Sequence, residues 1–309
     1  MYRRYTLEEV KRKIIDALRN DSAGLSGIEL AHKIGINRMT ITKYLNILST
    51  IGIIKKKKAG SVNIWYLESG VLDLEFPVNY IEIQQKFMNA IFQSNTEESY
   101  RIIISVINST LDKIKILTDV IVPTINTLNE LYNRGRIGDT ERISLLTSLS
   151  EILDLIKFNA QPEKIRRNAN MLTVAGCEDR IYLAKTGTVA LQILGWNSSY
   201  IGNVEQHIDP FFDIDFQRYI AKVWSDKRGL MVVCIYSSEE SSLRFLSIAT
   251  KAMKTKLKGE LYVILLTLPE LVAKFEDIGA DFAFKDLQSL IDWSDKIYKD
   301  LNSGSKYAG

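Results

Sequence analysis

The C-terminal half of the chain alternates short β-rich runs with helical segments, and this alternation restricts the possible folds more than any other feature. From residue 168 the β-rich runs are MLTVAG, SSYIGN, LMVVCIY, ELYVILLT and DFAF. The helical segments begin near Glu178, Asp213, Glu239, Pro269 and Asp286. Strands that alternate with helices are typical of a parallel sheet covered on both faces. We therefore expect a doubly wound, five-stranded parallel α/β domain over residues 167–300 and a disordered tail over residues 301–309.

Ligands of such sheets bind outside the carboxyl ends of the strands. The candidate ligand-binding residues after the first and third strands are Glu178, Asp179, Arg180, Ser237 and Ser238. Arg180 stands at the start of the first helix, where its guanidinium could meet an anionic ligand. It could equally form an ordinary surface ion pair with Glu178 or Asp179. Both interpretations stay open at the level of the sequence.

The register of the first strand separates two interpretations of this domain. With a strand at RIYLAK and a loop at Thr186–Thr188, the segments KTGT and IYSSEESS resemble the phosphate-binding loops of a sugar-isomerase (SIS) phosphosugar domain. Only the eight residues from Thr188 to Gly195 would then remain for a helix, which is about two turns. A strand over residues 170–176 instead leaves roughly 17 residues for the helix. We predict this second register.

The basic residues are concentrated at the N-terminus. Residues 1–68 contain thirteen Lys and Arg against six Asp and Glu, a balance of +7. Because the whole chain carries +3, the remaining 241 residues carry −4. A small basic module on a slightly acidic body indicates a polyanion partner for that module alone.

The basic module reads as three helices and a β-hairpin. Thr6 is the expected N-cap of an amphipathic helix, TLEEVKRKIIDALRN, and SGIELAHKIG reads as a second helix that ends at Gly35. Asn37 caps a third helix, RMTITKYLNILST, and the segments IIKKKK, AGS and VNIWYLE predict a hairpin with one charged strand. This order, with the pattern T-I-x-x-x-L-x-x-L-x-x-x-G-I-I, resembles the winged helix-turn-helix transcription regulators of bacteria and archaea. The resemblance covers residues 5–68.

The resemblance implies double-stranded DNA as the partner, with the third helix in the major groove. In that helix Ile41, Leu45 and Leu48 recur at i, i+4 and i+7 and so face the core, which leaves the opposite side for base edges. The predicted DNA-binding residues are Arg38, Met39, Thr42, Lys43 and Asn46 in this helix and Lys55, Lys56, Lys57 and Lys58 in the wing. Such regulators usually read paired half-sites, so a homodimer or higher homo-oligomer is expected.

Residues 70–166 read as a linker and a helical bundle, and Pro123 marks the start of one helix. Periodicity alone predicts a dimerising or spacer bundle here. Residues 80–300 as a whole, however, resemble a helical bundle followed by a cobalamin-binding α/β domain, as in the CarH-type light-sensing repressors. The similar segments are DVIVPTINTLNELYNRGRIGDTE, LQILGWNSSYIG and IGADFAF.

Several residues depart from that family's pattern. Its His-x-x-Gly, which supplies the lower cobalt ligand and room for the corrin, corresponds to Arg180 and Leu183. Its Gly-Gly, which admits the nucleotide tail, corresponds to Thr267-Leu268-Pro269. The Trp and the Glu-His pair of its bundle correspond to Tyr132, Arg142 and Ile143, so Tyr132 joins the candidate ligand-binding residues.

These departures predict no cofactor and make cobalamin unexpected, because a guanidinium stays protonated and has no lone pair for cobalt. The C-terminal half would then mediate dimerisation or bind a different small-molecule effector. With histidines only at positions 32 and 207 and cysteines only at 177 and 234, the sequence predicts neither a metal site nor a disulfide framework.

No His, Cys or paired carboxylate of the α/β half stands in a recognisable catalytic spacing, so we do not expect an enzyme. No apolar run approaches 18 residues, and no membrane association is expected. The sequence therefore predicts a cytoplasmic DNA-binding transcription regulator. The alternatives are a regulator with an SIS-like phosphosugar-sensing domain and a corrinoid-binding carrier protein.

Overall fold

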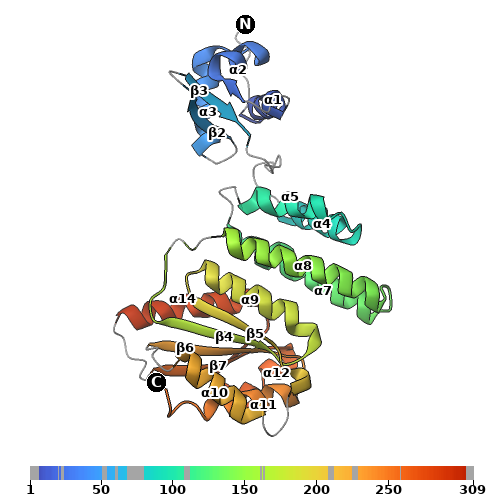
Figure 1. The fold of residues 1–309 in the computed structure, drawn as a ribbon, viewed down its shortest axis with the longest axis vertical. Coiled ribbons are helices and arrows are strands. Elements are labelled where there is room, and N and C mark those ends of the chain that lie inside the picture. The colour runs from blue at the N-terminus through green and yellow to red at the C-terminus, as the bar shows by residue number, and fades with distance from the viewer. Residues whose placement is uncertain are drawn as a thin grey trace. The chain divides into compact units, whose positions relative to one another are not determined.

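The computed structural model describes residues 7–19, 21, 24–50, 54–59, 62–67, 80–107, 112–160, 162, 164–207, 212–224, 229–257 and 259–303 (Figure 1). Contacts within the chain divide it into two compact units, Met1–Lys113 and Ile114–Gly309, here called the N-terminal and the C-terminal unit. The boundary falls inside residues 70–166, which the sequence predicts to be one linker and bundle. The predicted N-cap Thr6 and most of the hairpin turn, Gly60 and Ser61, lie outside the described residues.

The N-terminal unit begins with the predicted three helices and hairpin. Its elements are α1 (Leu7–Arg19), α2 (Gly27–Ile34), α3 (Arg38–Thr50), β2 (Lys55–Ala59) and β3 (Val62–Tyr66). The strands β2 and β3 pair antiparallel over their whole length. Ile41, Leu45 and Leu48 of α3 are fully buried in one core with Trp65 of β3, as the helical spacing predicts. The winged helix-turn-helix is therefore confirmed.

Local contacts define the start of α2 and the turn between α2 and α3. The backbone N–H of Ser26 donates to Glu29 Oε2 over 2.7 Å, and the backbone N–H of Glu29 donates to Ser26 Oγ over 3.2 Å, a reciprocal capping box. Gly35 ends α2 in the left-handed conformation, with φ at 71°. Asn37 Oδ1 accepts a hydrogen bond of 2.8 Å from the backbone N–H of Met39, so Asn37 caps α3 as predicted. Gly35 and Asn37 thus set the direction in which α3 leaves the turn.

A two-residue strand that the sequence did not predict precedes α2. This strand, β1 (Leu25–Ser26), pairs antiparallel with β3 and completes a sheet of order β1-β3-β2. Gly24 enters it with φ at +80°, and a Cβ atom there would lie 2.7 Å from the carbonyl oxygen of Trp65. Glycine is required at this position both for the backbone conformation and for the close approach.

The middle of the chain is helical, as predicted. It contains α4 (Tyr80–Phe92), α5 (Thr96–Ile107), α6 (Lys113–Ile116), the π-helical turn η1 (Leu117–Ile121), α7 (Val122–Asn133) and α8 (Asp139–Asn159). Pro123 is the second residue of α7, but the predicted helix start there is not a free end, because α7 continues from η1 in helical backbone conformation. Helices α7 and α8 belong to the C-terminal unit.

The sheet of the C-terminal unit consists of β4 (Ala169–Ala175), β5 (Asn197–Asn203), β6 (Leu230–Tyr236), β7 (Glu260–Leu266) and β8 (Phe282–Phe284). Among the described residues these strands lie in the order β5-β4-β6-β7-β8, and every neighbouring pair is parallel. The predicted five-stranded parallel sheet is therefore confirmed. Because β4 has β5 on one side and β6 on the other, the chain reverses its direction of winding there. The carboxyl ends of β4 and β6 form the switch point, where ligands of such folds bind.

The first strand has the register that we predict. A single turn of 3₁₀ helix, η2 (Glu178–Arg180), follows β4 and leads into α9 (Ile181–Ile193). The segment RIYLAK lies at the start of α9 and is not a strand, which removes the register on which the SIS interpretation depends.

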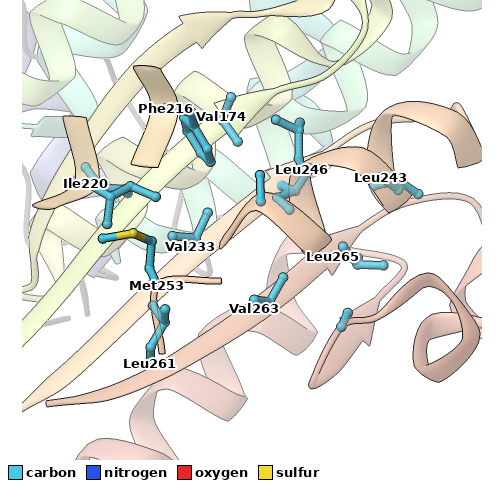
Figure 2. Packing of buried hydrophobic residues seen from close by; sticks show 14 of the residues in the cluster. Val174, Phe216, Ile220, Val233, Leu243, Leu246, Met253, Leu261, Val263 and Leu265 are labelled. Atoms are coloured by element: carbon cyan, nitrogen blue, oxygen red, sulfur yellow. The ribbon is translucent and has the colours of Figure 1, made fainter. Parts of the chain in front are cut away.

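Helices cover both faces of the sheet: α9 and α14 (Leu287–Ser303) lie on one face, and α10 (Phe212–Trp224) and α11 (Glu240–Lys251) lie on the other (Figure 1). Alternate strand residues such as Val174, Val233 and Leu265 point toward α10 and α11. There they pack with Phe216 and Leu246 in a continuous apolar core (Figure 2). The opposite side of the strands carries the residues that face α9.

Two details of the C-terminal half differ from the prediction. The helical segment that begins at Pro269 consists of two short helices, α12 (Pro269–Val272) and α13 (Phe275–Ile278), because the chain turns at Ala273 and Lys274. Helix α14 continues to Ser303, three residues beyond the predicted end of the domain at residue 300. Its apolar side is buried as far as Ile297, which is 9% exposed, whereas Leu301 in the last turn is 38% exposed. The rest of the predicted tail, residues 304–309, lies outside the described residues.

Candidate functional site

The side of α3 away from the core is exposed. Its residues Arg38, Met39, Thr42, Lys43 and Asn46 all lie on the surface, and Met39 is 84% exposed. The Thr42 hydroxyl donates to the carbonyl oxygen of Arg38 over 2.8 Å, a contact within the helix. Arg, Lys and Asn are the residue types that read base edges in the major groove, and a methionine can contact the thymine methyl group. All predicted base-reading residues therefore share one accessible surface.

The four wing lysines, Lys55 to Lys58, are exposed along β2. Residues opposite one another in an antiparallel pair share a face of the sheet. Lys56, opposite Trp65, therefore shares the core-facing side with Lys58, whereas Lys55 and Lys57 lie on the other side. The Lys56 ammonium lies 5.9 Å from the centroid of the Trp65 ring. Both faces of β2 thus carry positive charge suited to phosphate groups.

At the switch point of the C-terminal unit, the loops after β4 and β6 are joined by hydrogen bonds. The Cys177 thiol donates to Asp179 Oδ1 over 2.8 Å and accepts from the backbone N–H of Ser238 over 3.1 Å. The hydroxyl of Ser237 donates to the same sulfur over 3.3 Å, and the hydroxyl of Ser238 donates to Asp179 Oδ1 over 2.9 Å. The structure therefore brings together Asp179, Ser237 and Ser238. Their side chains, however, form hydrogen bonds with one another and with Cys177 across the switch point.

Burial raises the pKa of the Cys177 thiol, and its hydrogen bond to Asp179 raises this pKa further. The side chain is 3% exposed. A thiol in this environment stays protonated at neutral pH, and the thiolate is the nucleophilic form. Cys177 is thus a structural part of the junction and is poorly suited to covalent catalysis.

A second set of contacts connects α8 with the same junction through Arg142. This residue is 8% exposed, and its Nη1 donates to Glu178 Oε1 over 2.7 Å. Its guanidinium lies over the ring of Tyr132, 4.4 Å from the centroid. Tyr132 donates in turn to Asp139 Oδ1 over 2.7 Å, and this hydrogen bond raises the pKa of the phenol. Two of the candidate residues, Tyr132 and Glu178, are therefore held by Arg142.

A contact from α7 reaches the neighbouring residue, because Asn129 Nδ2 donates to the carbonyl oxygen of Asp179 over 3.1 Å. Arg180 Nε lies 3.2 Å from Asp179 Oδ2, and the Arg180 side chain is 17% exposed. Of the two ion-pair partners that the sequence allows, Asp179 is the one in contact. The carboxylates of Glu178 and Asp179 already place negative charge at the N-terminus of α9, where the helix dipole favours it. A further anion there would meet like charge.

Between the end of β6 and α9, the space is filled by Tyr236. Its side chain is 2% exposed and packs directly against Gly187 of α9. A Cβ atom at Gly187 would lie 2.0 Å from the tyrosine hydroxyl oxygen and 2.9 Å from Cζ. The glycine is therefore required for the tyrosine ring to occupy this space.

The described part of the chain contains no group of three or more His, Cys, Asp or Glu side chains that could hold a metal ion. Among the helices of that part, none is long and apolar enough to cross a membrane. His32 and His207 are both exposed, on α2 and at the end of the short turn η3 (Glu205–His207).

Known proteins resemble the two parts of the chain separately. The family model for the HTH domain matches residues 10–60. No curated protein matches the chain at a significant level. Among solved structures, the monomethylamine corrinoid protein of Methanosarcina barkeri is 14% identical with a TM-score of 0.52, over 71% of this chain and 100% of that chain. A cobalamin-binding protein of Desulfitobacterium hafniense is 14% identical with a TM-score of 0.32, over 70% of this chain and 98% of that chain.

The chain thus combines a helix-turn-helix domain with a cobalamin-binding-like fold. The family match shows a helix-turn-helix domain at residues 10–60 and supports a DNA-binding regulator. At 14% identity, the likeness to the corrinoid protein concerns the fold alone.

The residues at the switch point do not fit a corrinoid held through a lower histidine. Arg180 offers no lone pair to cobalt, and neither His32 nor His207 follows β4. The hydrogen bond between Asp179 and Ser238 closes the loops over the strand ends, and Tyr236 fills the space beneath α9. The missing ligand is therefore only one of several obstacles.

We expect the purified chain to remain colourless after incubation with hydroxocobalamin and gel filtration. An Arg180→His variant should also remain colourless, because an imidazole restores the ligand but leaves Tyr236 and the closed loops in place. The visible absorption spectrum measures the outcome, and illumination should leave the oligomeric state unchanged. A red wild-type protein whose spectrum depends on His207 would show that the C-terminal unit does hold a corrinoid.

Sequence reasoning missed the roles of Asn129, Arg142 and Tyr236. Arg142 was identified only as a departure from a family motif, because nothing local indicates its contact with Glu178, 36 residues away. Tyr236 ends an apolar run and reads as an ordinary strand residue. A pairing between Tyr236 and the helical glycine Gly187 is the one signal that could have indicated a filled space.

Proposed function

We propose that the chain is a sequence-specific transcription regulator that binds double-stranded DNA as a homodimer. We further propose that its C-terminal unit has kept a cobalamin-binding-like fold without a corrinoid site. The observation that carries the proposal is the division of α3 within the matched domain. Ile41, Leu45 and Leu48 are buried, while Arg38, Met39, Thr42, Lys43 and Asn46 are exposed together.

The exposed residues of α3 are supported as the base-reading surface by their chemistry. Lys43 and Asn46 lie one turn apart on the helix, so both can reach into one groove. Lysine donates to guanine acceptors, and asparagine pairs with adenine through two hydrogen bonds. The lysines of β2 supply a separate contact to phosphates, which fixes the orientation of α3 but carries no sequence information.

The contacts at the switch point support a C-terminal unit that is folded without a cofactor. Arg142 and Asn129 join α8 and α7 to the loop after β4, and Cys177 and Ser238 join that loop to β6. A unit closed in this way can serve as a rigid body for dimerisation or respond to a ligand bound elsewhere. Dimerisation is favoured because helix-turn-helix regulators read two half-sites about one helical turn apart.

Replacing Lys43 or Asn46 with alanine should relax the sequence preference of the full chain at particular base pairs, by about 1 to 3 kcal/mol each. Both side chains point away from the core, so circular dichroism should not change. Selection of binding sites from a random DNA library measures the preference. The parent should select two half-sites related by a two-fold axis.

Lys86→Ala is a suitable control, because Lys86 is an exposed lysine on α4 that pairs with Glu82. This variant should select the parental site. If Lys43→Ala and Asn46→Ala also selected the parental site with full preference, α3 would not be the helix in the groove.

A further inference from the structure

The described sheet of the C-terminal unit has two edge strands, β5 and β8. An edge strand presents backbone N–H and C=O groups that can pair with a further strand. On β5 the edge is blunted, because the N–H of Ser198 donates to the carbonyl oxygen of Trp196 over 3.0 Å and its carbonyl oxygen accepts from Gln192 Nε2 over 2.7 Å. A bulge before Gly202, where φ is +123°, also bends this strand. The strand β5 is therefore a poor template for pairing.

The edge of β8 is formed by the backbone of Ala283. The N–H of Thr267 donates to the carbonyl oxygen of Phe284 over 3.1 Å, so Phe284 directs its backbone groups toward β7. Because these directions alternate along a strand, the N–H and C=O of Ala283 point away from β7. No hydrogen bond from the described residues reaches them. Ala283 thus offers one donor and one acceptor side by side at the sheet edge.

On the side of β8 that faces α14, the edge carries an aromatic cluster. The centroid of the Trp293 ring lies 5.3 Å from that of Phe282 and 6.2 Å from that of Phe284. The Tyr262 ring of β7 lies 5.9 Å from Phe282, and all four rings are half-buried. Aromatic residues of this kind are enriched in protein–protein interfaces. The edge therefore offers apolar area as well as backbone groups for hydrogen bonds.

The sequence of this edge is complementary to itself. It reads Asp-Phe-Ala-Phe-Lys over residues 281–285. With two copies antiparallel and Ala283 opposite Ala283, the two phenylalanines face each other across the pair, and Lys285 faces Asp281 of the second copy. Aromatic pairs and opposite charges in such positions stabilise a sheet. A shift of two residues in either direction separates these charges.

The side chains at the two ends of the edge suit this register. Lys285 is exposed, and the Asp281 side chain is 21% exposed. The Asp281 carboxylate accepts from Lys254 Nζ and from the backbone N–H of Val263, each over 2.8 Å, and keeps lone pairs for a second cation. A lysine on an edge strand usually discourages pairing. Here it selects a strand that carries an acidic residue at the matching position.

We propose that two copies of the chain associate through β8, antiparallel and with a two-fold axis at Ala283, so that their sheets become continuous. Each Ala283 would then exchange two hydrogen bonds with its equivalent in the second copy. This inference rests on the homodimer of the proposed function and names the surface that forms it. A two-fold axis is also the symmetry that paired half-sites require.

Sedimentation equilibrium of the full chain tests the interface. Ala283→Pro removes only the N–H that points away from β7, a position where an edge strand tolerates proline, so thermal unfolding should stay cooperative. We expect a dimer for the parent and a dissociation constant at least tenfold higher for Ala283→Pro. Lys285→Glu should have the same effect, because it places like charges opposite each other. Lys164→Glu is the control, since exposed Lys164 lies beside Gly195, before β5 at the other edge, and it should leave the constant unchanged.

A disulfide tests the register. Residues opposite each other in a hydrogen-bonded antiparallel pair have Cα atoms about 5.5 Å apart, which is within disulfide range. Ala283→Cys should therefore form a covalent dimer under mild oxidation, whereas Ser199→Cys, at an exposed position of β5, should not. Cys177 and Cys234 are buried and do not compete.

DNA binding is measured separately, by gel shifts of the same proteins with a single half-site. A parent dimer that survives both Ala283→Pro and Lys285→Glu, or that forms no disulfide through Ala283→Cys, overturns the β8 interface and leaves the homodimer of the proposed function intact. A parent that is monomeric both alone and on DNA overturns the interface and the homodimer together. A parent that dimerises through β8 but binds no DNA refutes the proposed function and leaves the interface standing.

Discussion

Replacing Gly187 with alanine should destabilise the C-terminal unit by about 1 to 3 kcal/mol, the usual cost of overpacking a core. In a helix interior, alanine is otherwise favoured over glycine by about 1 kcal/mol. The expected sign is therefore opposite to the one that helix propensity predicts. The reason is the hydroxyl of Tyr236, which would lie 2.0 Å from the new Cβ atom on a fully buried wall. Urea unfolding followed by tryptophan fluorescence measures the effect, because Trp196, Trp224 and Trp293 all belong to this unit.

Tyr236→Phe supplies the control for this prediction. Alone, it should change stability little, because the only polar group that interacts with the buried hydroxyl is the buried thiol of Cys234, a weak hydrogen-bonding group. Combined with Gly187→Ala, it should recover part of the lost stability, but not all, because Cζ still lies 2.9 Å from the alanine Cβ. A double variant as unstable as Gly187→Ala alone would show that Tyr236 does not occupy the space beneath α9.

The contact between Tyr236 and Gly187 matters for function because it decides what the C-terminal unit can hold. A lost metal ligand can be restored by one substitution, whereas a filled interior cannot. The ring of Tyr236 fills the space against α9, the hydrogen bond between Asp179 and Ser238 joins the loops after β4 and β6, and the ion pair between Arg142 and Glu178 joins α8 to the first of these loops. A ligand of this unit is therefore better sought outside the switch point.

The elements that the sequence predicts correctly are those with a regular local pattern. The spacing of Ile41, Leu45 and Leu48 determines both the buried and the exposed side of α3. Continuous apolar runs predict β4, β6 and β7, because a parallel strand inside the sheet is buried on both faces. The edge strands β5 and β8 are only partly buried, and they are predicted from their place in the alternation of strands and helices. The register of β4 follows from helix length, since the alternative left too few residues for α9.

The features that escape the sequence depend on contacts between distant residues. Strand β1 has two residues and exists because Leu25 and Ser26 meet Trp65 and Ile64 of β3. No local pattern signals such a pairing. The hydrogen bond between Arg142 and Glu178 likewise joins residues 36 positions apart. For the candidate ligand residues, the sequence indicates the correct strand ends but not that their side chains bind one another.

Removing lysines from the wing should weaken binding to every DNA sequence alike. If Lys55 to Lys58 contact phosphates, each double replacement with alanine should reduce the slope of log K against log salt by roughly 2, or about 1 per lost contact. The physical reason is counterion release, because each phosphate neutralised by a lysine frees a condensed cation. Fluorescence anisotropy of the full chain with random and selected duplexes, across a range of salt concentrations, measures the slope and the preference between the two.

Because alternate lysines of β2 lie on opposite sides of the strand, two double variants can be compared directly. Lys55→Ala with Lys57→Ala removes charge from the side of β2 away from Trp65, and Lys56→Ala with Lys58→Ala removes it from the other side. Lys86→Ala with Lys254→Ala removes the same charge from outside the winged helix and should leave the slope unchanged. A reduced slope in only one wing variant identifies the side that meets the backbone. An unchanged slope in both, with DNA still bound, would make the four lysines a solvated surface and assign phosphate contact to another part of the N-terminal unit.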